Sequence, residues 1–175
     1  DTTGSWEGIS IGQIAPNCTL SYAIFRKARR SGSEIKGAAM RISQLPTRML
    51  YLIGCSFEAN NAIASGWYPY SAGGAIYAYG GRIEIKNCSF IGNQAQNGSA
   101  IYIDPDFSGE ILIDSCTFLS NNSSDFSTTH LRNGYCIVQN SLFSNNSSGW
   151  WGCIAVGTDS ATIRNCTFNS NICGG

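Results

Sequence analysis

The chain has 175 residues, the length of one domain, and its 11 basic and 11 acidic residues give a formal net charge of zero. Charged residues make up only 13% of the chain, which excludes an electrostatic nucleic-acid binder. The sequence has no apolar run long enough for a transmembrane helix and no signal peptide at Asp1, so we expect no membrane span and, if the protein is secreted, its mature form.

Residues 1–50 differ in charge and pattern from the rest of the chain. They carry seven basic and three acidic residues, a formal charge of +4, whereas residues 51–175 carry −4. Apolar alternation over 6–14 and 18–25 is typical of strands. We predict an N-terminal cap and a first irregular coil over 1–50, because a solenoid must cover the apolar end of its first coil.

From residue 51 onward the sequence Phe-x-x-Asn occurs five times, and the steps between its phenylalanines are 33, 28, 25 and 25 residues. Periods of this size indicate a solenoid whose units stack on one another. We predict a buried phenylalanine ladder and an asparagine ladder at the following bend, where amide side chains bond the turn backbone and one another. The predicted ladders are Phe57, Phe90, Phe118, Phe143 and Phe168, and Asn60, Asn93, Asn121, Asn146 and Asn171.

Each repeat contains three short segments that alternate like strands, for example 74–78, 82–86 and 87–90. Three short strands in a repeat of this length predict an all-β fold, a right-handed parallel β-helix of about five coils. The repeats occupy 51–175 and form one continuous domain with the cap. Neighbouring coils of such a helix lie about 4.8 Å apart, so equivalent residues stack.

Eight cysteines without a Cys-x-x-Cys pair favour disulfides over a zinc site. Four of them precede a phenylalanine of the repeat by two positions, and their stacking allows either disulfides or a column of free thiols. The others include three near the C-terminal end, where one or two bridges are expected with the connectivity left open. The candidates are Cys55, Cys88, Cys116 and Cys166 on the column and Cys18, Cys136, Cys153 and Cys173 off it.

Eight Asn-x-Ser/Thr sequons are candidates for N-glycosylation: Asn17, Asn87, Asn97, Asn121, Asn122, Asn145, Asn146 and Asn165. An asparagine- and serine-rich composition also creates such triplets by accident, and that alternative stays open. Together with the cysteines, the sequons favour an oxidising extracellular location, with covalent glycans and no cofactor or metal.

Aromatic residues are predicted on the outer wall of the helix. They are Trp67, Tyr68 and Tyr70 in an insertion, Tyr77 and Tyr102 at stacked outward positions, and Trp150 and Trp151 just before 152–156, the last copy of the strand segment found at 74–78. Exposed aromatic rings could stack on sugars or on a partner protein. The alternative is that they close over a corner of their own coil.

A family resemblance follows from two motifs taken together. The sequence Gly73-Gly74-Ala75-Ile76 with the repeated Phe-x-x-Asn resembles the repeats of chlamydial polymorphic outer membrane proteins over about residues 53–171. The passenger regions of those proteins are right-handed β-helices on the cell surface that act in adhesion. The resemblance implies a β-helix fold and an extracellular structural or adhesive role.

Catalysis is not expected, although pectin-active lyases and hydrolases share this fold. The best carboxylate pair is Asp104 and Asp106, which could bind calcium but is more typical of a solvated turn. The single histidine, His130, aligns with Tyr77 and is predicted to be a surface residue. A lyase or hydrolase stays open as the third hypothesis.

The last repeat ends at Asn171, and no helix or polar coil follows to cover it. An uncovered coil invites pairing with another chain, and the +4 and −4 parts fit head-to-tail contact. We therefore predict an extracellular glycosylated structural protein, a subunit of a surface fibre or filament whose partner is itself. The alternative is a surface adhesin or a carbohydrate-binding β-helix.

Overall fold

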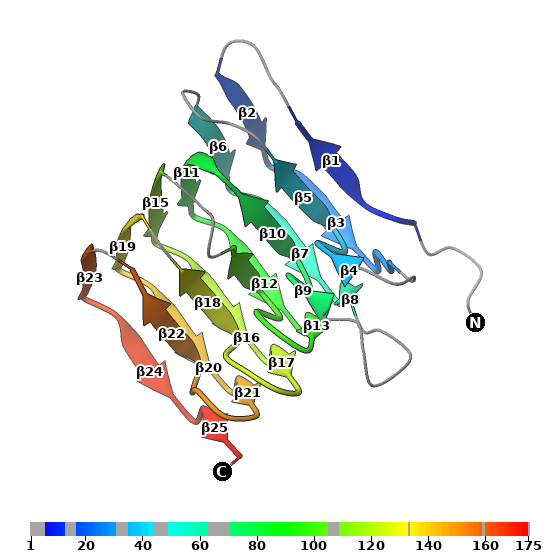
Figure 1. The fold of residues 1–175 in the computed structure, drawn as a ribbon. Coiled ribbons are helices and arrows are strands. Elements are labelled where there is room, and N and C mark those ends of the chain that lie inside the picture. Colours follow the sequence, from blue (N-terminus) through cyan, green and yellow to red (C-terminus); the bar gives the residue numbers. More distant parts are fainter. Residues whose placement is uncertain are drawn as a thin grey trace.

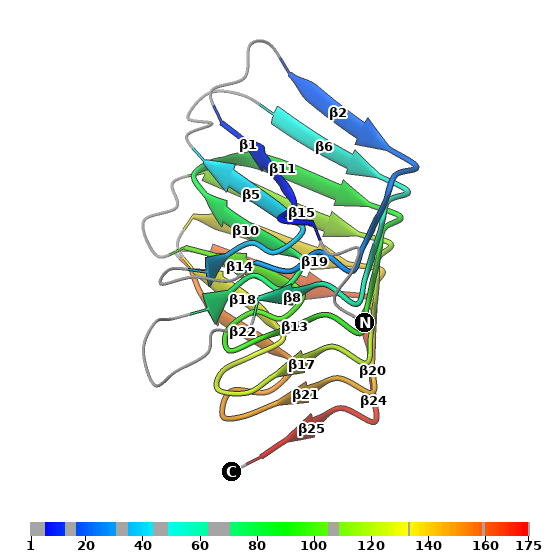
Figure 2. The ribbon, with the colours of Figure 1, turned by 90° about the vertical axis from the view of Figure 1, so that its right-hand side faces the viewer.

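The computed structural model describes residues 6–12, 17–30, 35–43, 49–62, 71–104, 109–132, 134–158 and 160–174. All regular elements in these residues are strands, and all their pairings are parallel. Strands of successive coils lie side by side along one axis (Figures 1 and 2). The predicted all-β solenoid is confirmed.

Two six-stranded sheets form two walls of the solenoid. Sheet I contains β1 (Ile9–Ile11), β5 (Met40–Ser43), β10 (Ile76–Tyr79), β14 (Ile101–Ile103), β18 (Thr129–Arg132) and β22 (Ile154–Gly157). Sheet II contains β2 (Cys18–Ser21), β6 (Met49–Ile53), β11 (Gly81–Lys86), β15 (Gly109–Asp114), β19 (Tyr135–Gln139) and β23 (Ser160–Arg164).

The remaining sheets have shorter strands. Sheet III contains β3 (Ile24–Arg26), β7 (Ser56–Glu58), β12 (Ser89–Ile91), β16 (Thr117–Leu119), β20 (Leu142–Ser144) and β24 (Thr167–Asn169). Sheet IV contains β8 (Asn61–Ala62), β13 (Gln94–Ala95), β17 (Asn122–Ser123), β21 (Ser147–Ser148) and β25 (Ile172–Cys173). A fifth, two-stranded sheet pairs β4 (Ile35–Lys36) with β9 (Ser71–Ala72).

The phenylalanines form one column through the core. All five predicted rings stack face to face, with centroid separations between 4.4 and 5.1 Å. Phe25 extends the column by one coil at 4.8 Å from Phe57, and Trp6 lies beyond it at 6.4 Å. The repeat motif does not detect Phe25, because Ala28 stands where the other copies have asparagine. β1, β2, β3 and β5 pair in register with later coils, so the predicted first coil belongs to the same solenoid.

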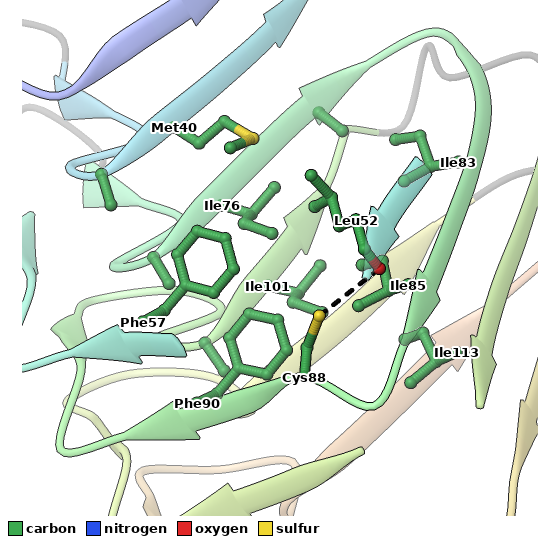
Figure 3. Packing of buried hydrophobic residues seen from close by; sticks show 14 of the residues in the cluster. Met40, Leu52, Phe57, Ile76, Ile83, Ile85, Cys88, Phe90, Ile101 and Ile113 are labelled. Carbon is green, nitrogen blue, oxygen red and sulfur yellow. Dashed lines mark hydrogen bonds between the residues drawn. The ribbon is translucent and has the colours of Figure 1, made fainter. Parts of the chain in front are cut away.

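Aliphatic side chains fill the space between the phenylalanine column and the opposite walls. Ile76 and Ile101 from sheet I, Ile83 and Ile85 from sheet II, and Phe90 from sheet III all point into one interior (Figure 3). Along the sheet II strands β11 and β15, the outward neighbours of these inward residues are polar or half-buried, as the alternation of strands requires.

The asparagine ladder ties each coil to the next. The Oδ1 of Asn93 accepts hydrogen bonds from the backbone N–H and the Nδ2 of Asn60, at 3.1 and 2.9 Å. Its Nδ2 donates to the Phe57 carbonyl and to Asn121 Oδ1, both at 2.9 Å. The same bonds continue through Asn146 to Asn171. Each buried amide thus satisfies two backbone groups of the preceding coil and bonds the ladder asparagines of both neighbouring coils.

Two bends in each coil require a left-handed backbone. One bend, between sheets II and III, contains Gly54, Asn87, Ser115, Asn140 and Asn165, with φ between 52° and 62°. The other, just before the asparagine ladder, contains Ala59, Gly92, Ser120, Asn145 and Ser170, with φ between 50° and 62°. Glycine and asparagine adopt this conformation most readily, which gives the asparagine-rich composition a structural cause.

The phenylalanine column supplies a matched test of the core. Phe90→Ala should lower the free energy of unfolding by about 3–5 kcal/mol, because it opens a cavity between two stacked rings. Phe168→Ala removes the same atoms from a ring that is 48% exposed, and should cost roughly 1–2 kcal/mol. Urea unfolding followed by circular dichroism measures both. Equal losses would contradict the single buried column.

Candidate functional site

The outward positions of sheet I carry a column of aromatic and polar residues. Tyr77, Tyr102 and His130 occupy equivalent positions in β10, β14 and β18, next to inward residues such as Ile76 and Ile101. The predicted alignment of His130 with the tyrosines is therefore correct. Successive coils place these three rings in a row along the helix axis.

The rings of this column are packed against one another. Tyr77 and Tyr102 stack at 5.7 Å with an interplanar angle of 5°, and His130 meets Tyr102 edge-on at 5.2 Å. Phe126 and Trp151, from two adjacent loops, lie 6.1 and 5.5 Å from His130. We call these five residues the aromatic wall.

Two predicted surface positions are corrected by this packing. Tyr77 was expected to be an exposed sugar contact but is only 2% exposed, because Tyr102 stacks on it and the Lys36 ammonium lies 5.4 Å from its ring centroid. His130 was expected on the surface but is 3% exposed, because Phe126 and Trp151 cover it. Both side chains point outward, yet other side chains close over them.

The tyrosine hydroxyl and the histidine have distinct electrostatic environments. The Tyr77 hydroxyl donates a hydrogen bond to Asp104, and burial together with this bond raises the pKa of Tyr77. Burial, helped by the positive charge of Arg132, lowers the pKa of His130 to about 4. Its Nδ1 is buried and has no hydrogen-bond partner. His130 is thus a neutral member of the wall near neutral pH.

The most exposed member of the wall is Trp151, and its chain neighbour Trp150 is exposed as well. Trp151 is 54% exposed although it contacts Phe126 edge-on at 5.2 Å, and Trp150 is 73% exposed. Their loop lies against the loop before Phe126, since a Cβ added at Gly149 would stand 2.4 Å from the Ser124 and Asp125 carbonyl oxygens. Phe126 and His130 therefore hold the Trp151 indole in one orientation, and the half-buried Asp125 lies in the neighbouring loop.

The five residues of the aromatic wall do not include the remaining predicted aromatic residues or the predicted carboxylate pair. Trp67, Tyr68, Tyr70 and Asp106 lie outside the described residues. Asp104 accepts the Tyr77 hydroxyl hydrogen bond. The described ranges contain no cluster of three or more metal-ligating side chains and no helix that could span a membrane. Sequence analysis missed Phe126, which lies outside the repeat motif and four residues before His130.

The eight cysteines, all within the described residues, have free thiols. The four column cysteines donate to backbone carbonyls of the preceding coil, at 3.4 to 3.6 Å, as the Cys88–Leu52 bond in Figure 3 illustrates. Of the two predicted arrangements for this column, the structure shows stacked free thiols. The predicted C-terminal bridge is absent, because Cys136 lies in sheet II, Cys153 precedes a sheet I strand and Cys173 lies in sheet IV. Burial raises the pKa of Cys136 to about 12, which keeps this thiol protonated.

The sequon asparagines fall into two groups. Asn97, Asn121 and Asn146 are buried, although all three are predicted glycosylation sites. A glycan needs open space at Nδ2, and in Asn121 and Asn146 this atom already makes two hydrogen bonds within the ladder. The exposed group is Asn17, Asn87, Asn122, Asn145 and Asn165.

The chain matches the model of a known protein family over most of its length. The family described as "Right handed beta helix region" matches residues 7–175. Comparison with curated proteins and with solved structures yields no match. The handedness predicted from the repeats agrees with this family, whereas the resemblance to chlamydial surface proteins stays a prediction.

The single histidine offers a direct test of the aromatic wall. Because burial disfavours the charged imidazolium, the folded protein should keep His130 neutral down to about pH 4. Its one pair of imidazole NMR signals should titrate there in the folded protein, and near pH 6.5 in urea. Because the pKa of His130 is lower in the folded than in the unfolded protein, the free energy of unfolding should fall as the pH drops from about 6.5 toward about 4. A folded-state midpoint near 6.5 would show that the ring is solvated.

Proposed function

The chain belongs to the right handed beta helix family, and on this premise we propose that it is an extracellular β-helix that binds carbohydrate on its aromatic wall. The fold of this family fits surface proteins and carbohydrate-related proteins in general. The observation that carries the proposal is the half-exposed Trp151, held in one orientation by Phe126 and His130.

The geometry around Trp151 supports stacking of a sugar ring. The apolar face of a pyranose packs on an indole, and an aromatic ring that is already fixed loses little side-chain entropy on binding. Trp150 adds a second exposed ring, and the Asp125 carboxylate can accept hydrogen bonds from sugar hydroxyls. Carbohydrate sites commonly combine aromatic surface with a few such polar groups.

The direction of the wall favours a chain of sugars over a single residue. Tyr77 and His130 are buried, but the half-buried Tyr102 lies one coil from His130 and continues the accessible part of the wall away from Trp151. A linear glycan lying along the helix axis would cross several coils. We propose binding without cleavage, since Asp104 is held by Tyr77.

Removal of the exposed indole tests this proposal. Trp151→Ala should weaken binding of the best ligand from a glycan array by about tenfold or more, measured by titration calorimetry. Tyr135→Ala is the matched control, because Tyr135 is 60% exposed but lies on sheet II. An unchanged affinity of Trp151→Ala, or release of new reducing ends from the bound glycan, would contradict binding without cleavage at this face.

A second candidate function, end-to-end assembly, is favoured by the C-terminal coil. Ile163, Phe168 and Ile172 of β23, β24 and β25 are 45%, 48% and 68% exposed. At the opposite end of the column, the half-buried Trp6 stacks on Phe25. A second copy placed with Trp6 against Phe168 would continue the column head to tail, as a structural fibre requires.

This assembly predicts association that depends on concentration. The mean sedimentation coefficient of residues 1–175 should rise with protein concentration as oligomers form. Ile172→Asp should give monomers, because it would bury an unpaired charge at the contact between copies. Ile91→Asp, on the side wall formed by sheet III, should leave association unchanged. A monomer at all concentrations in analytical ultracentrifugation would exclude the assembly.

A further inference from the structure

Four of the sequons form two overlapping pairs, and in each pair the fold buries one asparagine and exposes the other. Asn121-Asn122-Ser123-Ser124 and Asn145-Asn146-Ser147-Ser148 each contain two overlapping acceptor triplets. In the first pair Asn121 is buried and Asn122 is exposed, and in the second Asn146 is buried and Asn145 is exposed. The sequence alone does not distinguish these four asparagines, because each begins an Asn-x-Ser triplet.

The buried member of each pair belongs to the asparagine ladder. Asn121 Nδ2 donates to the Phe90 carbonyl at 2.9 Å and to Asn146 Oδ1 at 3.0 Å, which uses both of its hydrogens. Asn146 Nδ2 is used in the same way, toward Phe118 and Asn171. A sugar on either nitrogen would replace one of these hydrogens and would have to fit inside the solenoid.

The exposed member of each pair has no such role. Asn122 stands on the outer side of β17, and Asn145 occupies a left-handed bend with φ of 54°. Asn87 and Asn165 occupy the equivalent position of the other bend, with φ of 53° and 52°, and both are exposed. Left-handed bends turn these side chains away from the core, as N-glycan attachment requires.

We propose that the folded protein carries N-glycans on Asn87, Asn122, Asn145 and Asn165 and none on Asn97, Asn121 or Asn146. The four sites lie on sheets II to IV or on the bends between them. None lies on a sheet I strand, so the glycans coat the other walls and leave the aromatic wall bare. This inference rests on the extracellular location in the proposed function but not on carbohydrate binding, since the choice among the sequons follows from the burial of the asparagines.

The covalent step is the ordinary transfer to an asparagine amide. The side-chain Nδ2 attacks the anomeric carbon of an oligosaccharide carried on a lipid diphosphate. An N–C bond forms, the bond from the anomeric carbon to the phosphate oxygen breaks, the lipid diphosphate leaves, and the amide proton passes to the transferase base. A chain modified at a ladder asparagine cannot then form the ladder, so it is lost from the folded population.

Serine variants separate the overlapping triplets without touching any asparagine. Ser124→Ala removes the triplet of Asn122 and keeps that of Asn121. Ser147→Ala removes the triplet of Asn145, and Ser148→Ala removes the triplet of Asn146. The Ser148 hydroxyl has no hydrogen-bond partner, so its loss should leave the fold intact.

The experiment is site mapping on protein secreted from a eukaryotic host and shown to be folded by circular dichroism. Intact mass gives the number of glycans, and enzymatic deglycosylation in heavy-oxygen water marks each modified asparagine. Ser124→Ala and Ser147→Ala should each lose one glycan, and Ser148→Ala should lose none. A glycan on Asn121 or Asn146 in folded protein, an unchanged count in Ser124→Ala or Ser147→Ala, or a secreted chain without glycans would overturn the proposal.

Discussion

Parallel in-register pairing between consecutive coils is the constraint on which the rest of the structure depends. It aligns Met40, Ile76 and Ile101 across sheet I and brings the phenylalanine rings into face-to-face contact. The asparagine ladder fixes this register, because each Oδ1 accepts from both the backbone and the side chain of the preceding coil. A slip by one residue would break these bonds and turn the core outward.

The same register creates the aromatic wall from ordinary strand alternation. A residue between two inward positions must face outward, so aromatic side chains at one repeat position form a row along the axis. Tyr77, Tyr102 and His130 occupy that position, and Phe126 and Trp151 reach it from loops. The wall is packed enough to bury a histidine, yet it leaves one tryptophan half exposed.

The interior beneath the wall is more polar in the coil of Thr129 than in the two coils before it. Thr129 follows Ile76 and Ile101 in the inward column of sheet I, and Ser123 follows Ala95 in sheet IV. The Thr129 and Ser127 hydroxyls are buried without hydrogen-bond partners, and each such group costs about 1–3 kcal/mol. Packing of Phe126 and Trp151 over the outside covers this less apolar part of the solenoid.

The repeat, the ladders and the solenoid could be predicted from the sequence, because period and alternation are local properties that fix which side chains share a column. The side chains that cover an outward residue come from other coils, so they could not be predicted in the same way. Tyr77 and His130 are buried by rings from other coils, and Asn121 differs from Asn122 through hydrogen bonds to distant residues. Phe25 joins the column without the motif, since register with Phe57 is set by backbone pairing between β3 and β7.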